Sequence, residues 1–366
     1  MRQTIYLEIT RRVVDEQSSN VSKSVERLTS SPAEIKDRFP FMKFLYWLLY
    51  RTAEYCLRAI IFLVPRIPHR LLVPMTSATV HLTFAILWPY RKLMEENVSM
   101  AMSDQVLPAE QRKTVARRAW RNFVWGLYET ARALYSSRDA ICASVAIEGE
   151  EYLKRALEKG KGVIAFGAHL GNFTMIGTRL AAAGYPFSIV VKHPPDQRLT
   201  RLLDGYRAKG GIKTISAKPR RQAARQILGA LRRNELVLLL PDVFKSGRAN
   251  AQFLGSAVNI RRGPVTLALR SGAAVVPMLV TRDAEDRLTL RISSEIDLVK
   301  TGDLQEDVAA NLALFIRHLE DMVRRYPDQW CRLSPQGGPL SKNVRPMFPD
   351  FVQPGLELKE VKERRS

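Results

Sequence analysis

From residue 145 onward, short apolar runs alternate with longer amphipathic stretches. Apolar runs that are rich in β-branched residues predict strands buried on both faces of a sheet. These runs cover residues 145–147, 163–166, 187–191, 213–215, 236–240, 274–281 and 288–292. The stretches with helical periodicity cover residues 149–159, 173–183, 196–209, 219–233, 263–271 and 305–326. Strands that alternate with helices predict an α/β fold, with a mostly parallel central sheet flanked by helices.

The residues before this region follow a different pattern. Residues 1–40 are polar and mixed, show no signal-peptide pattern, and predict a loosely ordered extension in which 4–9 is the best strand candidate. Segment 41–65 is apolar and aromatic, but its four charged residues disfavour a membrane span. Segment 71–90 has no charged residue and is about long enough to cross a bilayer, although Pro74 weakens it. Helical periodicity returns over 107–137.

Two interpretations of the apolar N-terminal segments remain open: a pair of helices buried in a soluble domain, or a pair docked in a membrane interface. Aromatic residues mixed with cations favour the interface, with the apolar side in the acyl region. We therefore predict a polar extension over 1–40 and a helical membrane-associated region over 41–137, monotopic rather than spanning. An α/β domain over 138–335 and a tail with little regular structure over 336–366 follow.

The charge of the chain predicts a polyanionic partner. Lysine and arginine exceed aspartate and glutamate by 57 to 36, which gives a net charge of +21 and a pI near 10.2. Nucleic acid, an anionic membrane and an acidic protein all fit this excess. No zinc finger, RNA-binding aromatic strand or basic zipper pattern occurs, and the aromatics concentrate in the N-terminal region. This distribution favours an anionic membrane surface over nucleic acid.

Several classes of site are disfavoured by the sequence. Cys56, Cys142 and Cys331 are widely spaced and predict reduced core thiols in a cytosolic compartment, with neither a metal site nor a disulfide framework. No glycine-rich phosphate loop and no GxSxG elbow occurs, which disfavours nucleotide chemistry and a serine hydrolase.

Two polar residues follow predicted buried strands. His169 comes after the run 163–166, and Asp242 comes after the run 236–240. A lone histidine is often structural, but the carboxyl edge of an α/β sheet is where ligands and chemistry gather. The two side chains can approach each other there, and the carboxylate would then orient the imidazole as a general base. Asn172 is predicted to cap the helix that follows.

Six segments resemble, in the same order, motifs of the lysophospholipid acyltransferase superfamily and its branch of lipid A late acyltransferases. The histidine block is His169-Leu-Gly-Asn-Phe, similar to the family's H-x-G-N-W. The others are Arg91-Lys-Leu-Met-Glu-Glu-Asn97, Arg207-Ala-Lys-Gly210, the block from Gln226 to Asp242, Ala268-Leu-Arg-Ser-Gly-Ala-Ala-Val-Val-Pro277 and Arg325-Tyr-Pro-Asp-Gln-Trp330. The resemblance covers roughly residues 41–335.

The resemblance implies acyl transfer from a thioester, acyl carrier protein or coenzyme A, to a hydroxyl of a membrane lipid or glycolipid. It implies that His169 takes the proton from the acceptor hydroxyl, with no metal, cofactor or covalent intermediate. Basic residues would bind the acidic donor or lipid phosphates. The predicted substrate-binding residues are Asn172, Thr174, Lys192, Arg207, Arg261 and Arg262. The implied location is the cytoplasmic face of the inner membrane.

Two positions depart from the family pattern. The fifth residue after His169 is Thr174, where the family has an acid, and a threonine cannot balance an imidazolium charge. Either Asp242 supplies the carboxylate, or the chain is an inactive relative that binds acyl carrier protein or glycolipid at the membrane. After Trp330 the chain reads Cys-Arg-Leu-Ser-Pro instead of a basic, histidine-containing tail, which leaves the acceptor lipid open.

Overall fold

The computed structural model describes residues 40–102, 108–244 and 249–330. The chain divides into two compact units, Met1–Ala53 with Phe348–Ser366, and Glu54–Met347. In the first unit the described residues belong to the beginning of helix α3 (Pro40–Leu63). The predicted N-terminal extension with its strand at 4–9, and the predicted C-terminal tail, lie outside the described residues.

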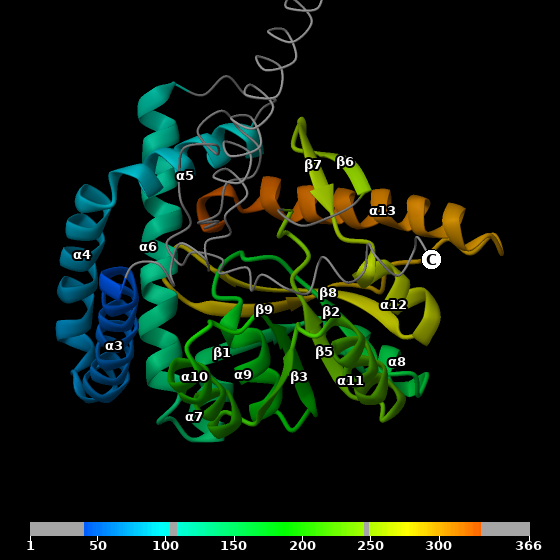
Figure 1. Ribbon diagram of the computed structural model, residues 1–366, viewed down its shortest axis with the longest axis horizontal. Coiled ribbons are helices and arrows are strands. Elements are labelled where there is room, and N and C mark those ends of the chain that lie inside the picture. The colour runs from blue at the N-terminus through cyan, green and yellow to red at the C-terminus, as the bar shows by residue number, and fades with distance from the viewer. Residues whose placement is uncertain (1–39, 103–107, 245–248, 331–366) are drawn as a thin grey trace, which may run out of the picture. The chain divides into compact units, whose positions relative to one another are not determined.

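A seven-stranded sheet forms the centre of the larger unit, in the order β1-β9-β8-β2-β5-β3-β4 (Figure 1). The strands are β1 (Val145–Glu148), β2 (Val163–Phe166), β3 (Phe187–Val191), β4 (Ile212–Ser216), β5 (Leu236–Leu239), β8 (Ala274–Arg282) and β9 (Leu288–Ile292). Strands β8, β2, β5, β3 and β4 pair in parallel, β9 is antiparallel to β8, and β1 is parallel to β9. The predicted mostly parallel sheet is confirmed, and each predicted strand coincides with an observed one.

Helices cover both faces of this sheet (Figure 1). They are α7 (Arg138–Ser144), α8 (Glu150–Glu158), α9 (Thr174–Ala182), α10 (Gln197–Lys209), α11 (Arg220–Arg232), α12 (Gly263–Ser271) and α13 (Leu304–Arg325). Successive strand residues point to opposite faces, so β2 contributes to two hydrophobic clusters. Ile164 and Phe166 belong to the cluster with α11, α12 and α13. Val163 and Ala165 belong to the cluster with α8 and α9.

A two-stranded hairpin, β6 (Ala249–Phe253) and β7 (Ser256–Ile260), packs against α13 and was not predicted from the sequence (Figure 1). Its two turn residues, Leu254 and Gly255, have φ angles of 50° and 75°. A leucine is an uncommon residue at positive φ, and the usual Asn-Gly or Asp-Gly signal is absent. The turn therefore carries no local signature in the sequence.

The N-terminal helices of the larger unit pack on one another through apolar side chains. Helix α4 (His69–Ile86), α5 (Trp88–Ala101) and α6 (Ala109–Ala133) share a cluster that includes Phe84, Met94 and Trp120. In the described part of the chain, no single helix is long and apolar enough to cross a membrane. The segments Arg70–Ile86 and Arg91–Ala101, bent by 96°, meet the criterion of length and composition together.

The prediction of core thiols is wrong for one cysteine. Cys56 is exposed on α3 and Cys142 is half-buried, and both are free. Cys331 lies outside the described residues. Cys56 is exposed because it follows the buried Glu54 by two residues, which places it on the opposite side of the helix.

One buried acid at the start of β5 makes the stability of the fold sensitive to low pH. Hydrogen bonds from Arg233, and less strongly from Lys213, lower the pKa of Glu235 below its ordinary value of 4.5, against the opposing effect of burial. A lowered folded-state pKa gives stability that is present above the unfolded-state pKa and lost as the pH falls through the folded value. We expect Glu235→Gln to flatten the loss of thermal stability below about pH 4.5. Calorimetric midpoints across the acid range measure this, and an unchanged slope would contradict it.

Candidate active site

His169 lies just beyond the carboxyl end of β2, in the middle of the sheet. Strand β2 is buried at all four residues and pairs in parallel with β5 on one side and β8 on the other. Asp242 lies beyond the same end of the neighbouring β5. Parallel neighbours end at the same edge of a sheet, so the fold brings the two residues together although 73 positions separate them.

The carboxylate of Asp242 holds His169 at two points. Its Oδ1 lies 2.7 Å from Nδ1 of the imidazole, and its Oδ2 accepts the backbone N–H of His169 at 2.9 Å. The Asp242 side chain is fully buried, whereas a quarter of the His169 side chain is exposed. Phe173 packs edge-on against the imidazole, with ring centroids 4.9 Å apart. The prediction that the two side chains meet is confirmed.

This contact decides which nitrogen of His169 carries the proton. An ionised carboxylate only accepts hydrogen bonds, so the neutral imidazole must carry its hydrogen on Nδ1. Nε2 is then the basic nitrogen of the neutral ring. The buried charge of Asp242 also stabilises the imidazolium that forms when Nε2 takes a proton. The pair therefore has the geometry of an oriented general base.

The turn after His169 is fastened to two distant segments. Gly171 has a φ of +56°, and a Cβ atom there would lie 1.9 Å from the carbonyl oxygen of Val280 in β8, so only glycine fits. The N–H of Gly171 donates to the carbonyl of Gln329, and that of Asn172 donates to the carbonyl of Val280. The side chain of Gln329 exchanges two hydrogen bonds with the backbone of Arg282. The Tyr-Pro-Asp-Gln-Trp block thus supports the histidine turn.

Asn172 does not cap α9, so that prediction is wrong. The helix begins at Thr174 after Phe173, without a side-chain cap. The Asn172 side chain is buried and turns instead toward α6, where its Nδ2 donates to Oε2 of Glu129 at 2.9 Å. Thr174 donates to Oδ1 of Asn172 at 2.6 Å, and its hydroxyl lies 2.5 Å from that of Thr130 on α6. The recorded hydrogen bonds of the Thr174 hydroxyl therefore connect it to Asn172 and α6.

Glu129 is the carboxylate that the sequence analysis missed. It accepts from Asn172 and also from Nη2 of Arg282 at 2.7 Å, and Arg282 is only 5% exposed. An acid thus stands beside Asn172 and Thr174, but it comes from α6 and not from the position five residues after the histidine. Nothing in the local sequence of α6 identifies Glu129, because its two partners lie 43 and 153 positions away.

The predicted basic residues lie in two groups. Arg207, on α10, is bound by Asp204, which also contacts Nε2 of His193 at 3.0 Å. Lys192 precedes this helix and is exposed. Arg261 and Arg262 are exposed at the start of α12, and Arg262 also lines a cavity between the β6–β7 hairpin and α13. Their role in binding stays a prediction.

Comparison of the whole chain with known proteins identifies its family. The sequence profile of the bacterial lipid A biosynthesis acyltransferases matches residues 42–336. A phosphatidylinositol mannoside acyltransferase of Mycolicibacterium smegmatis (strain ATCC 700084 / mc(2)155) is 28% identical over 189 residues, 51% of this chain and 60% of that protein. A lipid A biosynthesis palmitoleoyltransferase of Escherichia coli (strain K12) is 25% identical over 226 residues, 61% and 71% of the two chains.

Among solved structures, the 1-acyl-sn-glycerophosphate acyltransferase PlsC of Thermotoga maritima matches 69% of this chain and 96% of its own, with 11% identity and a TM-score of 0.31. The match to the mycobacterial relative spans 60% of that protein's length. The family profile, in contrast, extends over both the N-terminal helices and the sheet with its histidine block. The chain belongs to the bacterial lipid A biosynthesis acyltransferase family.

Proposed function

We propose that this protein transfers a fatty acyl chain from a thioester to a hydroxyl group of a membrane lipid or glycolipid, with His169 as general base and Asp242 as its partner. The observation that carries the proposal is the 2.7 Å contact between Nδ1 of His169 and the buried carboxylate of Asp242. Family membership supports the same reaction class, and both named relatives act as acyltransferases on a lipid.

The chemistry needs only one base that later returns its proton. Nε2 of His169 takes the proton of the acceptor hydroxyl while the hydroxyl oxygen attacks the thioester carbonyl. The tetrahedral intermediate then breaks its carbon–sulfur bond, and the imidazolium gives the proton to the leaving thiolate. An ester and a free thiol result, and Asp242 stabilises the imidazolium between the two steps.

The donor is proposed to be acyl carrier protein or acyl-coenzyme A. Both are strongly anionic, and the chain carries a net charge of +21. Lys192, Arg207, Arg261 and Arg262 are the cations proposed to meet the donor or the acceptor, with Asn172 and Thr174 shaping the turn beside the base. The alternative of an inactive relative rests on the missing acid at Thr174, and the contact of the Asp242 carboxylate with His169 favours the active enzyme.

The proposed reaction is tested by following a labelled acyl chain. Purified protein is incubated with acyl carrier protein or coenzyme A carrying a radiolabelled acyl group, together with a total membrane lipid extract. We expect the label to enter the lipid fraction with release of one thiol per acyl group transferred. Thiol release without labelled lipid would indicate a hydrolase, and absence of both with either donor would contradict the proposal.

The membrane location is proposed from the exposed apolar side chains of α3 and α4. Phe62 and Leu63 on α3, and Leu71, Leu82 and Ile86 on α4, are all more than half exposed. Apolar side chains beside a basic surface suit the interface of an anionic membrane. We therefore propose a peripheral or monotopic association with the cytoplasmic face of the inner membrane.

Two of these side chains provide a test of membrane association. Leu82 and Ile86 are 62% and 63% exposed on the same side of α4. We expect Leu82→Ser with Ile86→Ser to weaken co-sedimentation with anionic vesicles by about thirtyfold, because each substitution loses about 1 kcal/mol of transfer free energy. The control is Leu304→Ser, an exposed leucine at the start of α13. Equal binding of the double variant and the wild type would exclude α4 from the interface.

A further inference from the structure

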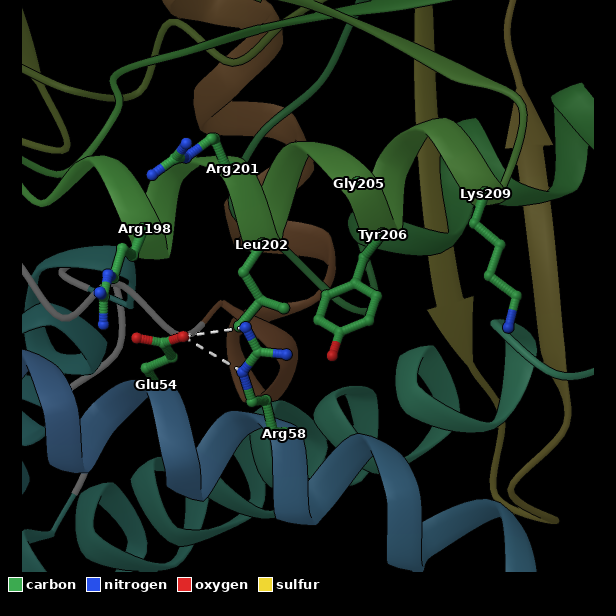
Figure 2. Close-up of a pocket in the computed structure, with 8 residues that line it drawn as sticks. All are labelled: Glu54, Arg58, Arg198, Arg201, Leu202, Gly205, Tyr206 and Lys209. Atoms are coloured by element: carbon green, nitrogen blue, oxygen red, sulfur yellow. Dashed lines mark hydrogen bonds and ion pairs between the residues drawn. The ribbon is translucent and has the colours of Figure 1, made fainter.

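A basic groove separates α3 from α10 (Figure 2). Its volume is about 600 Å³. The polar residues that line it are Glu54 and Arg58 from α3, and Arg198, Arg201, Tyr206 and Lys209 from α10. We call this the α3–α10 groove. None of these residues belongs to the site proposed for acyl transfer.

The charges of the α3–α10 groove do not cancel. Glu54 is its one carboxylate, and Arg58 binds it through Nε at 3.2 Å and Nη2 at 2.9 Å. Arg198 and Arg201 are exposed, and no ion pair joins either to a carboxylate among the described residues. Together with Lys209 they leave an excess of three positive charges around the cavity. The groove is therefore suited to an anion.

The hydroxyl group of Tyr206 adds a hydrogen-bond donor to the groove. Figure 2 shows the Tyr206 ring extending from α10 toward α3, with its hydroxyl beside the Arg58 side chain. Burial raises the pKa of this hydroxyl, although Arg58 acts in the opposite direction. The hydroxyl thus keeps its proton at neutral pH and can donate it to an oxygen atom. At the other end, Nζ of Lys209 lies 3.7 Å from the centre of the Tyr135 ring, which fixes the position of the ammonium.

The surface next to the groove is apolar. Beyond Arg58, helix α3 exposes Ile60, Phe62 and Leu63, and the guanidinium of Arg66 lies 3.7 Å over the Phe62 ring. Cations beside exposed aliphatic and aromatic side chains are the arrangement found at the level of lipid headgroups. An acidic protein, in contrast, would need a contact of about 800 Å² per partner rather than a narrow cavity.

We propose that the α3–α10 groove binds the phosphate of a membrane lipid headgroup, in addition to the site for acyl transfer. The guanidinium groups of Arg198 and Arg201 provide the paired donors that match phosphate oxygens. The apolar side chains of α3 then lie toward the acyl chains of the same lipid. The groove fixes how the protein sits on the membrane and favours phosphate-bearing lipids over other anionic lipids.

The test compares two vesicles of equal surface charge. Phosphatidylcholine vesicles contain either phosphatidic acid or oleate, adjusted to the same zeta potential, and no acyl donor is present. We expect the full chain to prefer phosphatidic acid, and Arg198→Gln with Arg201→Gln to lose that preference with about a tenfold weaker affinity. The matched control, Arg225→Gln with Arg232→Gln on α11, removes the same charge from exposed positions and should keep the preference.

Three results would overturn the proposal. The first is an undiminished preference for phosphatidic acid in the Arg198/Arg201 variant with an unchanged thermal midpoint. The second is release of the wild-type protein from the phosphatidic acid vesicles by inorganic phosphate at the same concentration as the accessible lipid. This would indicate a site for the free anion. The third, measured separately with unacylated acyl carrier protein, is that the Arg198/Arg201 variant loses binding to this protein while its binding to both vesicles is unchanged, which would indicate a protein partner. The vesicle test measures no turnover, so a negative result would not contradict the proposed acyl transfer. In the same way, absence of acyl transfer would not contradict lipid binding in the α3–α10 groove.

Discussion

The Asp242→Asn variant is expected to lower turnover by about 10⁴ while the protein stays folded, by analogy with the same change in a Ser-His-Asp triad. The asparagine side chain has one oxygen where the aspartate has two. If that oxygen accepts the backbone N–H of His169, the amide NH₂ faces Nδ1 and forces the ring hydrogen onto Nε2. The imidazole then has its proton on the nitrogen that should act as base, and its charged form loses the buried carboxylate.

The measurement separates this mechanism from a loss of structure. We expect kcat to fall and KM to stay within a few-fold, because Asp242 lies fully buried behind the imidazole and the role proposed for it involves no contact with substrate. The near-ultraviolet circular dichroism spectrum reports whether the fold persists. A fall in kcat of less than tenfold, with the fold intact, would remove Asp242 from the mechanism.

The chain offers a matched control in its second histidine–aspartate contact. Asp204 lies 3.0 Å from Nε2 of His193, but its side chain is one-third exposed and also binds Arg207. We expect Asp204→Asn to change kcat by no more than a few-fold. A loss comparable to that of Asp242→Asn would instead assign the base to His193.

The Glu129→Gln variant is expected to lower the free energy of unfolding by about 3 kcal/mol, because it removes the nearer carboxylate from a buried guanidinium and leaves only Asp286, 4.0 Å away. Arg282 is only 5% exposed, and Glu129 binds it at 2.7 Å while also accepting from Asn172. Loss of the charge weakens both contacts at once. Chemical denaturation of the two proteins measures the difference.

A surface ion pair provides the comparison for Glu129. Glu148 and Arg291 form a salt bridge between exposed side chains on the edge strand β1 and its neighbour β9. Water already solvates both groups, so Glu148→Gln is expected to change the free energy of unfolding by about 0.5 kcal/mol or less. Equal effects of the two substitutions would mean that Glu129 does not act as a buried ion-pair partner.

Glu129 also bears on the departure at Thr174. In the family pattern the acid follows the histidine by five residues, whereas here a threonine fills that position and contacts Asn172 and Thr130. The carboxylate beside Asn172 comes from α6, and the carboxylate on His169 comes from the loop after β5. The missing acid therefore does not leave the histidine turn without negative charge.

The sequence by itself determined the sheet and the position of the histidine. The strands β2 and β5 are short apolar runs that are buried at every residue, and such runs are visible in the local sequence. Their observed bounds differ from the predicted ones by at most one residue. The contact between His169 and Asp242 was predictable because both follow strands of one parallel sheet. The family was predictable because its motifs recur in order along the chain.

Only the tertiary structure decided which side chains surround that pair. Glu129 joins Asn172 to Arg282 because α6 and β8 both pack against the histidine turn, and no local pattern records such packing. The separation of Arg207 from Arg262, and the meeting of Arg58 with Arg198 in one groove, likewise depend on how helices pack onto the sheet. Strand formation depends on neighbouring residues, whereas contacts between helices join residues that are distant in sequence, and a single chain carries no local signal for them.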